Sequence, residues 1–144
     1  MSKHATKVSR EEIVDELNGL MAEEAEAYLR YFQLRYRLND ADRKKAEKFF
    51  DGAMKETAEH AEAIAAHIRK LGHTPRLKIH VDLEGKPISF LDALAEALCF
   101  EQQALDAYKD LLPRVKGDPA LEAFVRQQVA TETEHVEEIE QLLK

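Results

Sequence analysis

The chain has 144 residues, a formal net charge of −7 and a composition that is 44% hydrophobic and 34% charged, with five glycines and four prolines. That length suits one domain, because two separate cores would each bury too little surface, and this composition is typical of long solvated helices, so we expect an all-α fold. The acidic balance argues against DNA as a partner, and no apolar run approaches the roughly 18 residues of a membrane span. We therefore expect a cytoplasmic protein without membrane contact.

The first eight residues are expected to form a flexible tail, followed by one domain over residues 9–144. Ser9 and Glu12 have the spacing of a capping box, which predicts that the first helix begins there. Apolar residues then recur every three or four positions, as on the buried face of a helix. They are Ile13, Leu17, Leu20, Ala27, Tyr31 and Leu38. Glu24 lies within this series, where a carboxylate is costly unless it is paired or bound to a cation.

Asn39 and Asp40 can each cap a second helix, which is expected to end near Leu71 and Gly72. Its predicted inner face carries a histidine, His60, among mainly apolar positions. The full set is Ala46, Phe49, Ala53, His60, Ile64 and His67. Residues 73–88 contain two prolines and a glycine and predict a long crossover loop. A connection of this length lets the second and third helices of a bundle run parallel.

The third helix is predicted to begin at Ser89, with Asp92 completing the cap, and to bend or end at Pro113. Glu101 lies within its apolar series. Cys99 lies in the middle of this helix, and we expect it to be a buried small side chain. The series is Leu91, Leu94, Leu98, Leu105, Tyr108 and Leu112. Asp118 and Pro119 predict the start of a fourth helix. Its inner series is Leu121, Val125, Gln128, Glu132, His135, Ile139 and Leu142.

Glu132 and His135 are three residues apart, so both project from one face of the fourth helix. A Glu-x-x-His pair alone is more often a solvated pair than a metal site. Here Glu24, His60 and Glu101 occupy corresponding places on the inner faces of the other three helices. Four helices that bring carboxylate and imidazole groups to one level of a bundle indicate a dinuclear metal centre. Tyr31 and Tyr108 lie near that level, where a phenol can hydrogen-bond a ligating carboxylate or donate an electron to an oxidised metal pair. Ordinary core tyrosines are nevertheless the favoured interpretation.

With these motifs the sequence resembles the bacterioferritin family. Leu17-Asn18, Glu24 and Tyr31-Phe32 have the spacing of its first helix, and His60-Ala61 precedes Pro75 at its interval. Glu101 and Glu132-x-x-His135 match its third and fourth helices. The resemblance implies a ferritin-like four-helix bundle with a long crossover between helices 2 and 3. It also implies two iron ions, with manganese or zinc as alternatives, and a ferroxidase that oxidises Fe(II) with dioxygen or peroxide for iron detoxification or storage.

The sequence departs from the bacterioferritin pattern in three places. Thr57 stands where the family has its bridging glutamate, and a neutral hydroxyl is a poor bridging ligand. Glu56 is the nearest carboxylate that can replace it. Ala58 stands where the family has its haem-binding methionine, so no haem is expected. The chain ends at Lys144, without the fifth helix of the large cage, which predicts a homo-oligomer that is a dimer or a smaller shell.

The predicted centre places Glu24 and His60 on one ion, Glu101 and His135 on the other, and Glu132 between them. Two other functions stay open. The same centre can serve a di-iron or manganese oxidase or peroxidase that acts on a small molecule, which requires an apolar channel. Alternatively, the loss of a glutamate at Thr57 leaves a metal-poor oligomeric bundle with a binding or structural role. Apolar side chains such as Tyr36 and Phe50 are expected on an exposed face that favours dimerisation.

Overall fold

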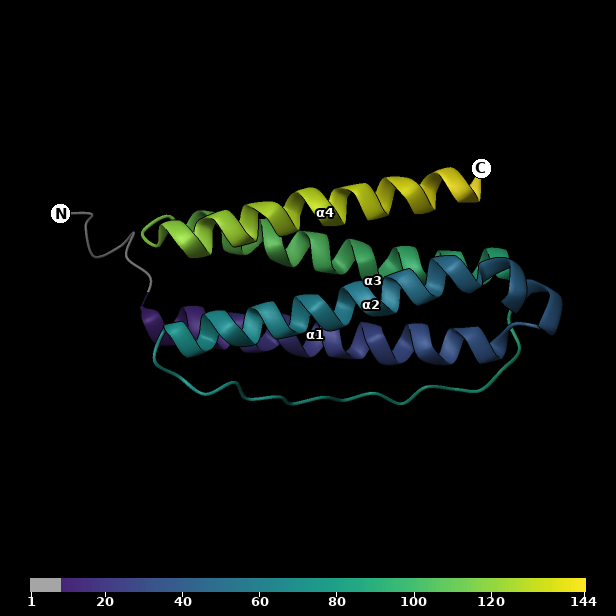
Figure 1. Cartoon of the computed structure of the whole chain (residues 1–144), viewed down its shortest axis with the longest axis horizontal. Helices are drawn as coiled ribbons and strands as arrows, with labels where there is room; N and C mark the ends of the chain where they lie inside the picture. The colour runs from purple at the N-terminus through teal and green to yellow at the C-terminus, as the bar shows by residue number, and fades with distance from the viewer. Residues whose placement is uncertain (1–8) are drawn as a thin grey trace.

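Four long helices form a bundle, and the all-α prediction is confirmed (Figure 1). The computed structural model describes residues 9–144, so the predicted tail over residues 1–8 lies outside the described residues. The helices are α1 (Arg10–Arg37), α2 (Asp40–Lys70), α3 (Phe90–Leu111) and α4 (Pro119–Leu143), with a short 3-10 turn η1 (Leu112–Arg114) after α3. No helix in the described part is both long and apolar enough to cross a membrane.

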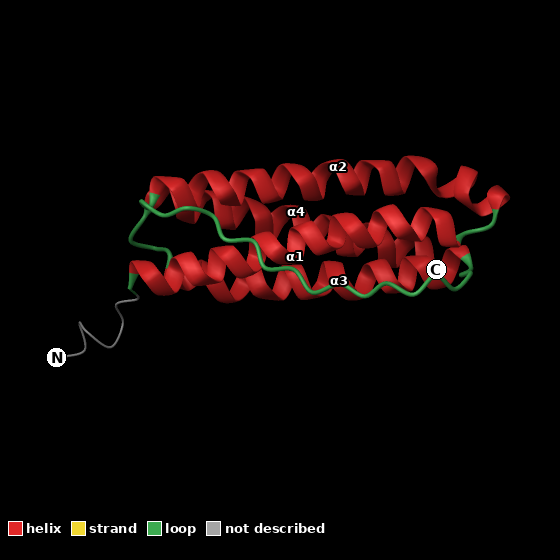
Figure 2. Cartoon of the chain, turned by 90° about the horizontal axis from the view of Figure 1, so that it is seen from below, coloured by secondary structure: helices red, strands yellow, loops and turns green. Residues whose placement is uncertain are grey.

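The segment between α2 and α3 runs along the full length of the bundle and returns the chain to the end at which α2 began (Figures 1 and 2). As a result α2 and α3 run parallel, as the length of the loop predicted. The loop is held to α1 by hydrogen bonds at both ends. The backbone N–H of Arg76 donates to Asn18 Oδ1 (2.8 Å), and that of Ile88 donates to the carbonyl of Arg37 (3.1 Å).

The helices begin where the capping residues predicted. The side chains of Ser9, Asn39, Ser89 and Asp118 each accept a hydrogen bond from a backbone N–H in the first turn of their helix. At the other end of α2, Gly72 has a φ of 87°, a left-handed conformation that favours glycine after a helix. These local signals set the lengths of the helices, and those lengths align the inner-face residues of all four helices.

The core consists of two apolar clusters at opposite ends of the bundle. The first cluster includes Leu17, Ile64, Tyr108 and Val125, and the second includes Tyr31, Phe50, Ala97 and Ile139. On every helix a short stretch of residues separates the part that belongs to the first cluster from the part that belongs to the second. The buried carboxylates Glu24, Glu101 and Glu132 lie in those stretches. The fold therefore places one polar layer between two apolar clusters near the middle of the bundle.

Several predicted positions of single side chains were wrong. On α2, Ala46 and Ile64 are buried as predicted. The other buried residues are Phe50, Met54, Thr57 and Ile68, whereas Phe49, Ala53 and His67 are only partly buried, because the line of residues beside the predicted one faces the core. Phe50 is consequently in the core and does not contribute to an exposed face. On α3, Leu91 is 55% exposed and Cys99 is also exposed. Ala93 and Ala97 fill the core at that end of α3 instead.

Candidate metal centre

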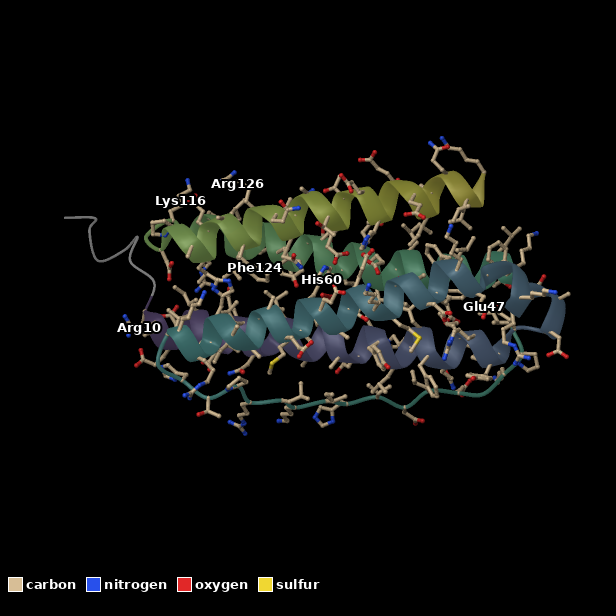
Figure 3. The ribbon with its side chains drawn as sticks, viewed as in Figure 1. Arg10, Glu47, His60, Lys116, Phe124 and Arg126 are labelled. Atoms are coloured by element: carbon tan, nitrogen blue, oxygen red, sulfur yellow. The ribbon has the colours of Figure 1, made fainter. Side chains whose placement is uncertain are left out.

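Each of the four helices contributes at least one side chain to the polar layer. Glu24 comes from α1, His60 from α2, Glu101 from α3, and Glu132 with His135 from α4. The three carboxylates are at most 5% exposed, and His60 lies near the middle of the bundle's length (Figure 3). The structure thus brings together all five residues that the sequence predicted.

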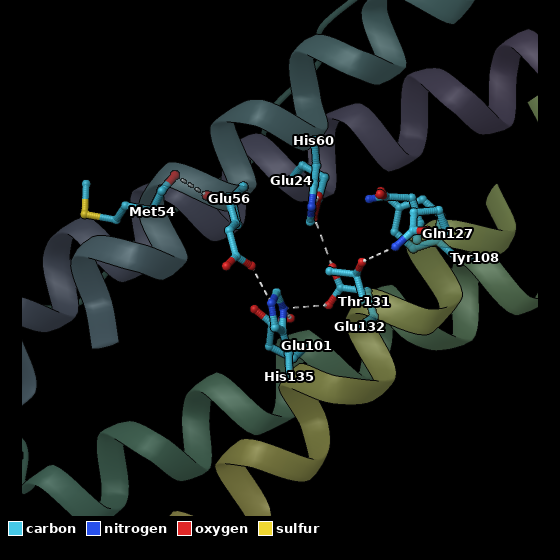
Figure 4. Close-up of polar contacts among 12 residues, drawn as sticks. Glu24, Met54, Glu56, His60, Glu101, Tyr108, Gln127, Thr131, Glu132 and His135 are labelled. Atoms are coloured by element: carbon cyan, nitrogen blue, oxygen red, sulfur yellow. Dashed lines mark hydrogen bonds and ion pairs between the residues drawn. The ribbon is translucent and has the colours of Figure 1, made fainter. Parts of the chain in front are cut away.

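These side chains form two adjacent groups that share Glu132 (Figure 4). In the first, His60 Nδ1 lies 2.7 Å from Glu24 Oε2 and 3.7 Å from Glu132 Oε1. In the second, His135 Nδ1 lies 3.4 Å from Glu101 Oε2 and 3.7 Å from Glu132 Oε2. Within each group, one ligand atom from every residue lies within 4.8 Å of the others. Glu132 therefore turns one oxygen toward each histidine, which is the geometry of a carboxylate between two cations.

Without a metal the centre shares protons among these groups. Burial, followed by the neighbouring Glu101 and Glu24 carboxylates, raises the pKa of Glu132 to about 9. Burial opposes the charge on His135, but the nearby carboxylates of Glu101 and Glu132 outweigh burial and raise its pKa to about 11. Burial likewise acts to raise the pKa of Glu101, yet its polar contacts with His135, Glu132 and Tyr31 lower it to about 2. Positive charge is thus favoured at this point of the core.

The donors present fit a pair of divalent cations. Glu132 Oε2 is buried and has no hydrogen-bond partner among the described residues, an arrangement that is costly unless a cation or proton occupies the adjacent space. Carboxylate oxygens combined with imidazole nitrogens suit iron, manganese or zinc. Glu24, Glu101 and Glu132 would supply three negative charges against the charge of two such ions.

Tyr31 has a more direct part in the centre than the favoured interpretation of a core tyrosine predicted. Its hydroxyl is buried and donates a 2.6 Å hydrogen bond to Glu101 Oε1, so it orients the carboxylate whose other oxygen faces His135. Tyr108 is also buried, and its hydroxyl accepts a 3.4 Å hydrogen bond from Gln128 Nε2. Tyr108 therefore remains a core tyrosine, whereas Tyr31 supports a candidate metal ligand.

The two residues of α2 that the sequence left in question lie in different surroundings. Thr57 is buried, and its Oγ1 donates to the carbonyl of Met54 (2.9 Å), so this hydroxyl is used by the backbone of its own helix. Glu56 reaches across to α4 and pairs with Nε2 of His135 (Figure 4). Neither residue belongs to the two groups around Glu132. The sequence indicated Glu56 as a spare carboxylate but not this contact with His135.

Two pockets of about 410 Å³ each reach the centre from different sides. One lies between α1, α3 and the crossover loop, ends at Glu24 and Glu101, and is lined mainly by charged side chains. The other opens between α2 and α4 and ends at Glu101 and His135. Its walls combine aromatic and small residues with four further charged side chains. The aromatic and small residues are Tyr31, Phe49, Phe90, Ala46, Gly52 and Ala53, and the charged ones are Lys45, Lys48, Glu56 and Glu138. The centre is thus reached by one charged route and one mainly apolar route.

Comparison with known proteins places this arrangement in a family. The model of the ferritin-like domain matches residues 14–144. The chain belongs to the ferritin-like domain family. No curated protein matches the sequence.

Several solved structures share the fold, and one of them is described as a ferritin-like, diiron-carboxylate protein. A protein of this description from Bacillus anthracis str. Ames is 23% identical, with a TM-score of 0.83 over 94% of this chain and 97% of that one. The dodecameric thioferritin of Bacteroides fragilis, a bacterioferritin-related protein, is 22% identical, with a TM-score of 0.83 over 95% of this chain and 87% of that one. The antigen TpF1 of Treponema pallidum is 14% identical, with a TM-score of 0.86 over 94% and 93%. At these identities the likeness shows the ferritin-like bundle.

Proposed function

We propose that the chain binds two iron ions and oxidises Fe(II) with dioxygen or peroxide, in a bacterioferritin-like role in iron detoxification or storage. The observation that carries the proposal is the position of Glu132, which is buried and turns one oxygen to each of two ligand groups. Glu24 and His60 would hold one ion, and Glu101 and His135 the other. The ferritin-like family and the diiron-carboxylate neighbours support iron as the metal.

The protein's own side chains prepare the centre for this reaction in three ways. Glu24, Glu101 and Glu132 supply negative charge in a layer that is closed above and below by apolar clusters. Protons held by Glu132 and His135 leave as cations enter, so these two groups exchange proton for metal charge. Tyr31 keeps Glu101 in place through its hydroxyl. Two neighbouring iron ions supply the remaining chemistry, since together they can give up two electrons to one oxidant.

The two pockets offer separate routes for the two reactants. The charged pocket between α1 and α3 carries Glu23, Glu26 and Asp82 and leads to Glu24, which suits an incoming cation. The pocket between α2 and α4 has mainly apolar walls and leads to His135, which suits an uncharged oxidant such as dioxygen.

Anaerobic loading of metal-free protein with Fe(II), followed by a pulse of dioxygen, tests the proposal. We expect two Fe(II) to be oxidised rapidly per chain, and Glu132→Ala to lose most of that fast phase. Glu134→Ala is the matched control, because Glu134 lies on the same helix but is exposed. Oxidation in the wild type at the rate of free Fe(II) in buffer would contradict the proposal.

The aromatic and small-residue walls of the α2–α4 pocket support a second candidate, a di-iron or manganese oxidase or peroxidase acting on a small molecule. Such a function requires an apolar channel, and a mainly apolar pocket of about 410 Å³ would admit a compact organic substrate. Substituting Gly52 by Leu would narrow this pocket. Unchanged Fe(II) oxidation in Gly52→Leu, combined with lost turnover of an organic reductant, would favour this candidate over iron storage.

A homo-oligomer is the assembly that we propose. Exposed apolar residues follow one side of α1 and continue onto the crossover loop, and we call them the α1 apolar surface. They are Tyr28, Leu29, Phe32, Tyr36 and Leu77. Phe32 and Tyr36 are 47% and 62% exposed, and the surface borders a hollow of about 360 Å³ with apolar walls. Such a surface favours burial against a second copy, at least as a dimer. The thioferritin from Bacteroides fragilis is described as dodecameric.

A further inference from the structure

The imidazole of His135 has carboxylates on both of its nitrogens. Nδ1 faces Glu101 and Glu132, the residues that share a candidate ion with it, at 3.4 and 3.7 Å. Nε2 faces away from that group and pairs with Glu56 Oε2 (Figure 4). Because one ring nitrogen can bind a metal only when the other is free to carry the proton, the two contacts assign different tasks to the two nitrogens.

The contact with Glu56 differs from an ordinary surface pair. The Glu56 side chain as a whole is 44% exposed, and the His135 side chain is 21% exposed. Oε2, the Glu56 oxygen that pairs with His135, is nevertheless buried and has no hydrogen-bond partner among the described residues, so the ion pair with Nε2 is the contact that can satisfy it. Water therefore competes little for that oxygen. A carboxylate held in this way against the outer nitrogen of a metal-binding histidine fixes the orientation of its ring and strengthens it as a ligand.

Glu56 is also separate from the place where a bridging carboxylate would lie. Glu132 is the residue common to both ligand groups, and Glu56 belongs to neither among the described residues. One turn further along α2, His60 meets Glu132 at 3.7 Å, whereas Glu56 meets His135. Two residues of α2 therefore contact α4: His60 is a candidate metal ligand, and Glu56 contacts the outer nitrogen of the candidate ligand His135.

We propose that Glu56 is a positioning residue that accepts a hydrogen bond from Nε2–H of His135 and so presents Nδ1 to the ion at Glu101 and Glu132. This inference rests on the proposed dinuclear centre. The role of Glu56 makes the two metal positions unequal, because no carboxylate among the described residues contacts Nε2 of His60. The position with His135 is then held in place by a carboxylate behind its imidazole, and replacing Glu56 affects that position selectively.

Zinc titration of the metal-free full chain, followed by calorimetry, tests this assignment. We expect wild type, Glu56→Ala and Glu56→Gln each to bind two ions per chain. Glu56→Ala should weaken one of the two ions by about 10- to 100-fold, the usual effect of losing such a supporting group. Glu56→Gln should recover most of that loss, because the amide oxygen still accepts from Nε2–H. Glu59→Ala, an exposed carboxylate three residues along α2, should bind as wild type does.

A nuclear magnetic resonance signal of the zinc-loaded protein provides a readout that general loss of structure would not mimic. The Nε2–H proton of His135 should be observed in slow exchange in the wild type and should exchange at least about 10-fold faster in Glu56→Ala, while the Nε2–H of His60 is unchanged. Circular dichroism confirms that each variant is folded.

Three results would overturn the inference. Equal affinities and equal proton exchange in wild type and Glu56→Ala would show that Glu56 does not position His135. A loss in Glu56→Gln as large as in Glu56→Ala, affecting both ions, would indicate a bridging ligand instead. A wild type that binds no zinc and no iron would overturn the proposed function together with this inference, whereas two bound ions with unchanged variants would overturn this inference alone.

Discussion

Replacing Glu132 by leucine should stabilise the metal-free protein while removing its metal site. Glu132 is 1% exposed, and its Oε2 has no hydrogen-bond partner among the described residues. In Glu132→Leu each histidine keeps another carboxylate, because His60 still has Glu24 and His135 still has Glu101. A buried polar atom without a hydrogen-bond partner costs about 1–3 kcal/mol, so an apolar side chain of similar volume should recover a free energy of that order. At roughly 2–4 °C per kcal/mol, a gain of about 2 kcal/mol raises the Tm by about 4–8 °C.

The same substitution should abolish stabilisation by metal. A ligand present at about 100 times its Kd stabilises the folded state by about 2.7 kcal/mol, and Glu132→Leu should lose that increment. Thermal unfolding with chelator and with zinc measures both effects on one sample. Exposed Glu134 provides the control, since Glu134→Leu should change the unfolding free energy by no more than about 0.5 kcal/mol and keep the zinc response. A lower Tm for Glu132→Leu in chelator would show that the Glu132 carboxyl stabilises the metal-free fold, and an undiminished zinc response would show that zinc binds elsewhere.

Three further outcomes follow from the same structure. Folding raises the pKa of Glu132 from 4.5 to about 9 and that of His135 from 6.5 to about 11, so the folded metal-free chain retains protons that the unfolded chain loses. Its stability to urea should therefore fall as the pH rises from about 5 to 9, and a rise in stability would contradict this. Thr57→Glu should add a carboxylate beside the centre, so stopped-flow measurements should show faster Fe(II) oxidation, and an unchanged rate would count against position 57 lying beside the ions. Phe32→Glu combined with Tyr36→Glu should dissociate the oligomer without loss of helix, as light scattering would show, and an intact oligomer would place the interface elsewhere.

Much of the architecture could be predicted from the sequence because its signals are local. Ser9, Asn39, Ser89 and Asp118 cap helices through bonds to their own first turns, so their effect depends little on the rest of the fold. The candidate ligands were identifiable for a related reason. A carboxylate such as Glu24 within an apolar series is conspicuous, since burial without a partner is costly.

Side-chain detail depended on contacts that periodicity does not define. On α2, Phe49 and Phe50 are neighbours, as are Ala53 and Met54, so two adjacent faces had similar apolar character. Packing against α1 buries the second line, and this rotation also carries Thr57 into the core. The pairing of Glu56 with His135 was not predictable, because the two residues lie on separate helices and meet only after the bundle has formed.

Anomalous scattering from crystals of the iron-loaded protein would locate the two ions. We expect two ions per chain, about 3.5–4 Å apart, one beside Glu24 and His60 and the other beside Glu101 and His135, with Glu132 contacting both. The absence of iron from the polar layer under saturating Fe(II), or a single ion bound only by surface histidines such as His73 or His80, would contradict the dinuclear centre.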